Sequence, residues 1–522
     1  MPDLHSSLNY APKPLGFGTS GRRGLIADLT QLEIYINVTA ELEYLLSLSP
    51  EDGGIRPGDD FYYALDLRPS SPRLMEAVAQ AIEDAGMRGI SLGQIPTPAL
   101  MYYALAQGKA SIMITGSHIP FDRNGYKLNT SRGELLKEHE APIGAKVAEI
   151  RARIYAQDFD QSPFDESGAL RKRCAAAPAS DAGRERYAAR YLDFFPAQPG
   201  SLEGRRILVY QHSAVGRDLL VEVLTHLGAD IIPAGRSDTF VPIDTENIGA
   251  DQLDTIGKLA SHHPNLWAVV STDGDSDRPL LLAYDSTGQL KFFGGDLVGM
   301  ITAQYLNAGA VVVPVTCNDA IDQSALAPAL QPKTRIGSPY VVAGMAAAAA
   351  KGSQAVCGWE ANGGFLLGAD VTRHGRTLTA LATRDAFLPI LSVLYAAAER
   401  DVPVAELFSE LPRRFSRAGL LKDFPREISL RITERLSRPD SKEIAARIFT
   451  PALGFTSIDR FDYTDGVRII FANNEVAHIR ASGNADELRI YAVADTQARA
   501  DAIVAEGIRE PDGILRSLQQ LV

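Results

Sequence analysis

The sequence predicts several α/β domains followed by a smaller α+β domain. The chain has 522 residues, more than one hydrophobic core usually supports, and its length suggests three or four domains. Up to about residue 411, short apolar runs typical of strands alternate with segments of helical periodicity. Beyond residue 412, strand-like runs dominate and a C-terminal helix follows.

The first two predicted domains begin with clear strand and helix signals. The elements expected in the first domain, residues 1–196, are strands over 61–66 and 111–115 and helices over 71–85 and 185–195. Residues 159–181 are polar and lack periodicity, so we expect a surface connection there. The elements expected in the second domain, residues 197–293, are strands over 206–210 and 266–270 and a helix over 216–227.

The remaining residues are divided into two further domains. The elements expected in the third domain, residues 294–411, are a helix over 297–306, a strand over 310–315 and a helix through the alanine run 346–350. The strands expected in the fourth domain, residues 412–522, include 467–471 and 488–493.

Composition narrows the class of protein. The formal net charge of −12 disfavours nonspecific nucleic-acid binding, and an anionic substrate would have to be attracted by local Arg and Lys side chains. Three widely separated cysteines, Cys174, Cys317 and Cys357, suggest free thiols in a reducing compartment. No leader-like segment and no apolar run of roughly 18 residues occurs. We therefore expect a cytoplasmic protein without a membrane anchor.

Three carboxylates follow the predicted strand 266–270. Asp273, Asp275 and Asp277 stand at alternate positions, and such a cluster repels itself unless a cation neutralises it. Loops at the carboxyl ends of strands are where open α/β sheets bind ligands. Oxygen ligands favour a hard ion, with Mg²⁺ the first candidate. The alternative is a solvated acidic turn. An EF-hand fits less well, because Arg278 occupies its glycine position.

A serine follows the predicted strand 111–115. Ser117 could be a nucleophile, although Ile119 breaks the hydrolase elbow pattern, and His118 could orient it only in a sharply folded loop. A phosphorylated Ser117 would carry roughly 1.5 to 2 negative charges and could complete the coordination of the ion. Lys127 could approach the same centre. A structural turn and an ordinary surface lysine are the alternatives.

Two further loops offer polar groups. Glu360 and Asn362, in a glycine-rich segment after an apolar run, suit neighbouring sugar hydroxyls, or they belong to an ordinary glycine turn. A second loop could hold a phosphate or simply form a hairpin corner; its residues are Arg480, Ser482, Gly483 and Asn484. His262 and His263 lack metal-ligand spacing and receive no role.

Taken together and in this order, the four motifs and the segment FGTSGRRG at 17–24 resemble the α-D-phosphohexomutase family, the phosphoglucomutases and phosphomannomutases. The resemblance spans nearly the whole chain. The segments TGSHIPFDRNG and GWEANGG look most like those of a bacterial phosphomannomutase branch. It implies three similar α/β domains and a smaller C-terminal domain around one cleft. The implied partners are hexose phosphates, with no nucleic acid and no membrane.

The resemblance also implies residue roles. Ser117 would be the phosphorylated serine and, with Asp273, Asp275 and Asp277, would hold Mg²⁺. Glu360 and Asn362 would contact the sugar, and residues 480–484 the distal phosphate. A hexose 6-phosphate and a hexose 1-phosphate would interconvert through a 1,6-bisphosphate, which also serves as activator.

Charge and proton handling complete the expected mechanism. Arg23 and Arg278 would spread the developing charge, while Lys127 or His118 would handle the hydroxyl proton. We expect mannose to be the preferred sugar, with a glucose-specific enzyme or one of dual specificity as the alternative. A sugar phosphatase and a sugar-phosphate binding protein are less favoured.

This chain departs from the common family pattern at several positions. Gly116 and Ile119 stand where Ala and Asn are common, and Asn362 and Asn484 where Ser and Thr are usual. The segment around Gly337 lacks a basic residue often found after the glycine. Four of these positions lie in the loops expected to carry the phosphoserine, the sugar and the distal phosphate.

Overall fold

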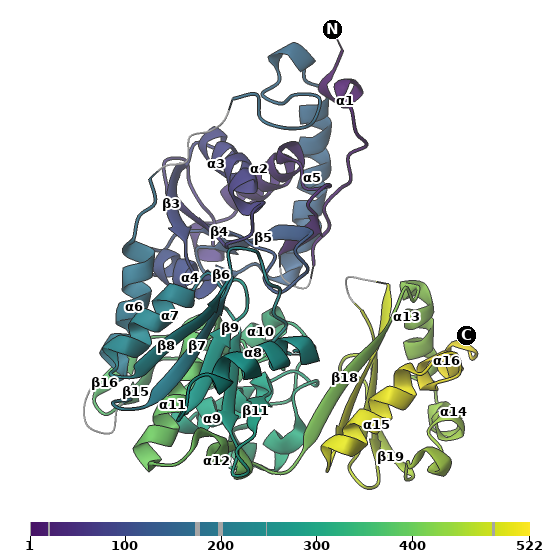
Figure 1. Ribbon diagram of the computed structural model, residues 1–522. Helices are drawn as coiled ribbons and strands as arrows, with labels where there is room; N and C mark the ends of the chain where they lie inside the picture. The colour runs from purple at the N-terminus through teal and green to yellow at the C-terminus, as the bar shows by residue number, and fades with distance from the viewer. Residues whose placement is uncertain (1, 19–20, 173–177, 197–201, 247, 483–485) are drawn as a thin grey trace.

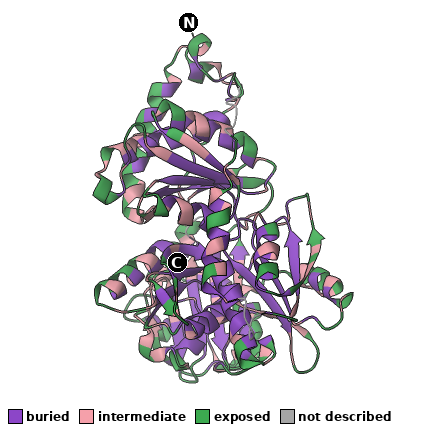
Figure 2. Cartoon of the chain, turned by 90° about the vertical axis from the view of Figure 1, so that its left-hand side faces the viewer, coloured by how far each residue is buried: buried purple, intermediate pink, exposed green. Residues whose placement is uncertain are grey.

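The computed structural model describes residues 2–18, 21–172, 178–196, 202–246, 248–482 and 486–522. Within them, three mixed sheets flanked by helices lead to an antiparallel sheet near the C-terminus (Figure 1). Buried residues follow the strands and the inner helix faces, and exposed residues lie on the outer faces (Figure 2). This arrangement confirms the predicted fold class.

The first sheet is formed by residues 22–134. Its strands are β1 (Arg22–Leu25), β2 (Asp60–Leu65), β3 (Arg88–Gln94), β4 (Ser111–Ile114), β5 (Arg123–Thr130) and β6 (Gly133–Glu134). The helices of this region are α1 (Leu4–Ser7), α2 (Gln31–Ser47), η1 (Pro50–Asp52), α3 (Ser71–Asp84), α4 (Thr97–Ala106), η2 (Lys137–His139), α5 (Glu140–Tyr155), η3 (Phe159–Gln161) and α6 (Ala182–Phe194). The strand order is β1-β5-β4-β2-β3; β2 is parallel to β3 and β4, and β5 is antiparallel to β4.

The second sheet repeats this plan. Its elements are β7 (Arg206–His212), α7 (Arg217–His226), β8 (Asp230–Arg236), α8 (Ala250–Ser261), β9 (Ala268–Thr272), β10 (Pro279–Tyr284) and β11 (Leu290–Phe293). The strand order is β11-β10-β9-β7-β8; β7 is parallel to β8 and β9, and β10 is antiparallel to β9. In both sheets a central strand lies between two parallel neighbours, and an antiparallel strand follows.

The third sheet follows the same plan, but isolated bridges take the place of one edge strand. Its elements are α9 (Gly295–Tyr305), β12 (Ala310–Val312), η4 (Asp319–Gln323), η5 (Ala327–Ala329), α10 (Ser338–Ala350), β13 (Val356–Trp359), β14 (Phe365–Leu367), β15 (Val371–Arg373), β16 (Arg376–Leu378), β17 (Leu381–Asp385), α11 (Phe387–Arg400) and α12 (Val404–Ser409). β12 pairs in parallel with β13. Isolated parallel bridges, Val311 with Leu330 and Pro314 with Thr334, replace a second strand.

The predicted site loops occupy equivalent places in these sheets. The Ser117 loop joins β4 to β5, the aspartate loop joins β9 to β10, and the Glu360 loop joins β13 to β14. In each case a strand paired in parallel is followed by an antiparallel one. The common topology accounts for how loops far apart in sequence come to one region.

The C-terminal domain is antiparallel. Its elements are β18 (Phe415–Lys422), α13 (Arg426–Arg435), α14 (Ser441–Ile448), η6 (Pro451–Leu453), β19 (Ile458–Asp462), β20 (Val467–Phe471), β21 (Val476–Ala481), β22 (Glu487–Ala494), α15 (Gln497–Ile508) and α16 (Ile514–Gln519). The strand order is β18-β22-β21-β20-β19. This sheet has a core of its own, whereas one buried cluster continues through parts of all three mixed sheets.

Two local expectations need correction. The strand predicted over 310–315 ends at Val312, and Pro314, which has no N–H to donate, contributes only an isolated bridge. The segment 159–181 is not only a surface connection, because Phe164 is fully buried in a cluster with α2 and α5. Among the described residues, no helix combines the length and apolar character needed to cross a bilayer.

Candidate active site

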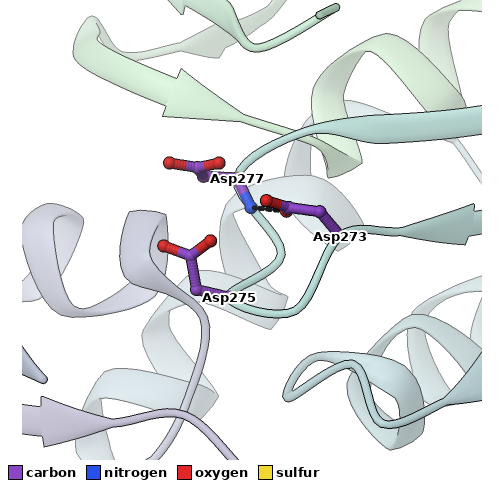
Figure 3. Close-up of side chains that lie close together, drawn as sticks. All are labelled: Asp273, Asp275 and Asp277. Carbon is purple, nitrogen blue, oxygen red and sulfur yellow. Dashed lines mark hydrogen bonds between the residues drawn. The ribbon is translucent and has the colours of Figure 1, made fainter. Parts of the chain in front are cut away.

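The aspartate loop is a tight turn between β9 and β10. Asp273, Asp275 and Asp277 are completely buried, and one ligand oxygen from each lies within 4.8 Å of the others. Their side chains project from one turn (Figure 3). Ser276 has a positive φ of 59°, and its Oγ accepts the Gly216 N–H at 2.9 Å. A contact with the residue directly before α7 therefore helps to shape the loop.

Each carboxylate has one oxygen held by the protein. Asp273 Oδ1 accepts the backbone N–H groups of Asp277 at 3.1 Å and Arg278 at 3.2 Å. Asp275 Oδ2 accepts hydrogen bonds from Thr97 Oγ1 at 2.6 Å and Lys127 Nζ at 2.7 Å.

Asp277 is held in the same way. Its Oδ2 accepts from Lys127 Nζ at 2.8 Å and from Arg384 Nε at 3.0 Å. Lys127 therefore bridges two of the three carboxylates and supplies positive charge between them.

The other oxygen of each carboxylate is available to a cation. Asp273 Oδ2 accepts the Ser117 hydroxyl at 2.8 Å. Asp275 Oδ1 and Asp277 Oδ1 are buried and have no hydrogen-bond donor among the described residues; Arg278 Nε is 3.7 Å from Asp277 Oδ1. Buried oxygens without donors are costly, and three carboxylates with a hydroxyl form the oxygen donor set that Mg²⁺ prefers. The residues present fit the predicted metal.

The pKa of one aspartate of the triplet is raised, whereas the pKa values of the other two are lowered. Burial, together with repulsion from Asp275 and Asp277, raises the pKa of Asp273 well above its ordinary value. Burial also opposes ionisation of the other two, but Lys127 keeps the pKa of Asp275 below its usual value, and Arg384 with Lys127 does the same for the pKa of Asp277. A divalent cation would favour ionisation of all three.

Ser117 lies directly against this cluster. It has a φ of 53°, a left-handed conformation that is uncommon for serine, and its N–H donates to Thr115 Oγ1 at 2.7 Å. Strained backbone of this kind concentrates at functional sites. The sharp fold of the loop also brings His118 Nδ1 to 3.4 Å from Ser117 Oγ.

Arg68 holds the Ser117 loop and was missed from the sequence. Its Nη2 donates to the carbonyls of Ser117 at 2.9 Å and Ile119 at 2.6 Å. Its Nη1 donates to the carbonyls of Pro120 and Arg123, both at 2.8 Å. The side chain is 1% exposed, and the residue closely follows β2, so its place after a strand was the one signal that the sequence offered.

The surroundings of Arg68 explain the glycine at position 116. A Cβ on Gly116 would lie 2.6 Å from Arg68 Cζ. The guanidinium also lies 3.9 Å from the ring centroid of Phe240, a residue that follows the second sheet's strand β8. Arg68 therefore fixes the Ser117 loop and joins it to the neighbouring sheet.

His118 is an acceptor in this site. Arg278 Nη1 donates to His118 Nδ1 at 2.9 Å, and a guanidinium cannot accept, so the proton of a neutral ring is on Nε2. Burial, then the cations Arg278 and Arg23, lower the pKa of His118 well below its usual value. Burial and Arg278 likewise lower the pKa of Arg23 to about 10. The predicted cations thus lie close to the Ser117 loop.

The predicted sugar loop is a glycine turn that also carries the polar side chains of Glu360 and Asn362. Gly363 has a φ of 85°, and Asn362 Oδ1 accepts the Gly364 N–H at 3.0 Å. The Asn362 carbonyl accepts Thr245 Oγ1 at 2.7 Å. The Asn362 side-chain oxygen therefore shapes its own turn, which leaves its amide nitrogen as the group suited to a ligand.

Arg384, which the sequence did not identify, connects three loops. Besides Asp277, it contacts Ser338 Oγ at 3.0 Å and Glu360 Oε2 at 3.4 Å through Nη1. Ser338 and Thr383 in turn donate to the two carboxylate oxygens of Glu134, each at 2.7 Å. Residues of the first and third sheets thereby meet beside the aspartate loop. No local sequence feature marked Arg384, because its partners are distant along the chain.

The predicted phosphate loop lies on the C-terminal domain. Arg480 is near the end of β21, and its Nε donates to Asp465 Oδ1 at 2.9 Å. Ser482 is buried, and its N–H donates to the Glu487 carbonyl at 3.0 Å, so the segment belongs to a hairpin. Gly483 and Asn484 lie outside the described residues. Cys174 also lies outside them, while Cys317 and Cys357 are buried free thiols.

Comparisons with known proteins identify the family. Three segments of the chain match models of the phosphoglucomutase/phosphomannomutase family. They are α/β/α domain I at residues 14–153, α/β/α domain III at 294–415, and the C-terminal domain at 427–509. The chain belongs to the phosphoglucomutase/phosphomannomutase family. The resemblance of its motifs is thereby confirmed.

Relatives within this family match the chain over nearly its whole length. A phosphomannomutase of Sinorhizobium fredii is 36% identical over 94% of this chain and 98% of its own. A phosphomannomutase of Salmonella muenchen is also 36% identical, over 97% of each chain. These matches support the bacterial phosphomannomutase branch.

Solved structures show the same fold. A phosphoglucomutase/phosphomannomutase family protein from Burkholderia thailandensis has a TM-score of 0.67 and 19% identity, covering 96% of this chain and 97% of its own. An Aspergillus fumigatus N-acetylphosphoglucosamine mutase, solved with GlcNAc-6P and magnesium, has a TM-score of 0.59 and 15% identity, covering 99% and 98%.

Proposed function

We propose that this member of the family is a phosphohexomutase that interconverts a hexose 6-phosphate and a hexose 1-phosphate. The observation that carries the proposal is the 2.8 Å contact of Ser117 Oγ with Asp273, beside two buried carboxylate oxygens without donors among the described residues. A nucleophilic hydroxyl in contact with a cation site suits phosphoryl transfer. Mannose is the preferred sugar, because relatives 36% identical over most of the chain are named phosphomannomutases. A phosphoglucomutase or an enzyme of dual specificity is the alternative.

We propose a role for each predicted site residue. Asp273, Asp275, Asp277 and Ser117 would hold Mg²⁺, which when bound supplies positive charge to the phosphoryl group and the serine oxygen. The carboxylate of Glu360 and the amide of Asn362 would bind sugar hydroxyls. The distal phosphate would be bound by the loop Arg480, Ser482, Gly483 and Asn484.

The reaction would consist of two phosphoryl transfers. In the first, the free sugar hydroxyl attacks phosphorus on phosphorylated Ser117; a bond forms between the sugar oxygen and phosphorus, and the bond to Ser117 Oγ breaks. The hydroxyl proton passes to Ser117 Oγ by way of His118 Nδ1, which is 3.4 Å from that oxygen and would release its hydrogen bond from Arg278 Nη1 to accept the proton. The 1,6-bisphosphate then turns end over end, and Ser117 takes the other phosphoryl group in the reverse sense.

The choice between His118 and Lys127 rests on contacts. Lys127 Nζ already donates to two carboxylates, at 2.7 and 2.8 Å, and an ammonium group has no lone pair to accept a proton. We therefore propose His118 as the proton carrier and Lys127 as a fixed positive charge. Arg23 and Arg278, the cations close to His118, would stabilise the transferred group.

Each predicted domain would have its own part in this function. Residues 1–196 would form the phosphoserine domain, 197–293 the metal-binding domain, 294–411 the sugar-binding domain and 412–522 the phosphate-binding domain. Hexose 1,6-bisphosphate would act as activator by phosphorylating Ser117. Buried free thiols at Cys317 and Cys357 suit a cytoplasmic enzyme.

Replacing Ser117 tests the proposal. Ser117→Ala should abolish interconversion of mannose 1-phosphate and mannose 6-phosphate, whereas Ser167→Ala, at an exposed surface position, should not change the rate. Intact mass should show a phosphoryl group on the wild type that excess unphosphorylated hexose removes and that Ser117→Ala lacks. A Ser117→Ala variant with wild-type turnover would exclude this nucleophile.

Product analysis separates the alternatives. A phosphatase would release inorganic phosphate from hexose 6-phosphate, and a binding protein would form neither product nor phosphoserine. Rates on mannose 1-phosphate and glucose 1-phosphate, each with its bisphosphate present, decide the sugar preference.

A further inference from the structure

We propose that Arg335 is a phosphate-binding residue that acts together with Arg480 on the substrate phosphate remote from Ser117. The inference rests on the proposed mutase function and adds to it a residue from the third domain. Arg335 lies in the loop that leads into α10, and it lines a cavity together with residues of the C-terminal domain.

The cavity has a suitable size and position. Its volume is about 460 Å³, within the usual range for small-ligand sites. It is lined by the segment around Phe17 and Gly18, the loop containing Arg335, and the C-terminal residues Asp465 and Arg480. A ligand bound there would contact the first, third and fourth domains at once.

Of the Lys and Arg side chains that line this cavity, two form ion pairs with carboxylates of the described residues and one does not. Lys137 Nζ pairs with Glu140 Oε1 at 2.6 Å, and Arg480 Nε pairs with Asp465 Oδ1 at 2.9 Å. Arg335 is exposed and forms no ion pair with any carboxylate among the described residues. Its guanidinium is therefore the uncompensated positive charge on the described part of the cavity wall.

An uncompensated guanidinium in this place favours a phosphate monoester. The chain has a net charge of −12, so attraction of a dianion depends on local positive charge. A guanidinium binds phosphate oxygens through two parallel N–H groups. Helix α10 begins three residues later, at Ser338, and its N-terminus adds a weaker positive potential.

The backbone beside Arg335 is also held in place. The N–H of Ile336 donates to Asp465 Oδ2 at 2.9 Å, while the other oxygen of Asp465 holds Arg480. One carboxylate thus sets the spacing between the Arg335 loop and the Arg480 strand. The two arginines reach the cavity from domains that this contact keeps together.

The test compares three variants of the full chain. Arg335→Gln should raise KM for hexose 6-phosphate on the order of tenfold, the usual effect of losing a charged hydrogen bond, with kcat retained within about twofold. Arg335→Lys, which keeps the charge but not the paired N–H groups, should give a smaller increase. Lys333→Gln removes a charge two residues away that pairs with Asp322 outside the cavity lining, and should leave KM unchanged.

Equilibrium binding provides a second measurement. The Kd of hexose 6-phosphate, measured by calorimetry, should increase with Arg335→Gln as much as KM does, while the melting temperature stays that of the wild type. Loss of kcat at constant KM, or unchanged KM and Kd, would overturn the assignment of Arg335.

Different results would overturn the mutase proposal and the role of Arg335. A wild-type protein that binds hexose 6-phosphate through Arg335 but does not interconvert it would overturn the mutase proposal and support the binding role. A wild-type protein that neither binds nor converts hexose phosphates would overturn both.

Discussion

Arg384 Nε donates to Asp277 Oδ2 at 3.0 Å, although the two residues are 107 positions apart. The same guanidinium reaches Glu360, so one buried cation lies between a predicted metal ligand and a predicted sugar ligand. Its side chain is only 4% exposed.

Removing this cation should destabilise the fold and the site together. Arg384→Met would remove this cation from two buried carboxylates, although Asp277 would keep Lys127, and we expect a loss of about 3 kcal/mol in the free energy of unfolding. Arg384→Lys should lose less. Arg460→Met, at an exposed pair with Asp459, should change stability by at most about 1 kcal/mol. Chemical unfolding measures all three, and equal stability of Arg384→Met and wild type would contradict the structural role.

Arg68 should control the activity of Ser117. Arg68→Met would leave the carbonyls of Ser117, Ile119, Pro120 and Arg123 without this donor. Misplacement of a catalytic group by about 1 Å costs on the order of 100-fold in rate, so kcat should fall by about that factor. Steady-state kinetics would show this, and retention of more than half the wild-type kcat would argue against it.

A milder change at the same contact is Gly116→Ala, whose Cβ would meet Arg68 Cζ at 2.6 Å. Overpacking of this kind costs about 1 to 3 kcal/mol unless the guanidinium moves. The control is Gly144→Ala in α5, which has nothing within 4 Å of the added Cβ and should be neutral or stabilising. Thermal unfolding of the two variants measures the difference, and equal melting temperatures would show that the guanidinium yields to the added methyl group.

Mg²⁺ should stabilise the folded protein as well as support catalysis. Chelation should stop interconversion, and added Mg²⁺ should restore it and raise the melting temperature, because the ion binds buried oxygens of the native state. Asp275→Asn should greatly reduce the rise in melting temperature. A melting temperature that is insensitive to Mg²⁺ in the wild type would exclude a metal site at the triplet.

His212 should make the protein sensitive to acid. Burial lowers the pKa of His212 to about 4, and its Nε2 donates to the carbonyl of Thr272, directly before the aspartate loop. Between pH 6.5 and 4 the unfolded chain binds a proton that the folded chain does not, so stability falls as the pH falls. The shift corresponds to about 3 kcal/mol lost by pH 4.

The matching variant isolates this effect. His212→Gln can keep a donor toward the Thr272 carbonyl without titrating, so the stability difference between wild type and variant should shrink or reverse as the pH is lowered from about 7 to about 4.5. Urea unfolding at the two pH values measures it, and a difference independent of pH would show that His212 does not titrate in this way.

Residues next to strand ends could be predicted because their signals are local. Asp273 and Ser117 each follow an apolar run, and carboxylates at alternate positions after a strand favour a cation site. Arg68 also follows a strand, and its role went unrecognised because its partners are mainly backbone carbonyls, which carry no side-chain signature. Thr97 and Arg384 had no local signal at all, since their partners in the site belong to another domain.

The sequence by itself determined the family, the alternation of strands and helices, and the chemical character of each loop, because these depend on residue types and short spacings. Only the tertiary structure decided that Ser117 Oγ lies 2.8 Å from Asp273, that Lys127 bridges Asp275 and Asp277, and that Arg335 and Arg480 line one cavity. These relationships depend on how separate sheets pack against one another, and packing depends on the summed shape of many side chains rather than on any one motif.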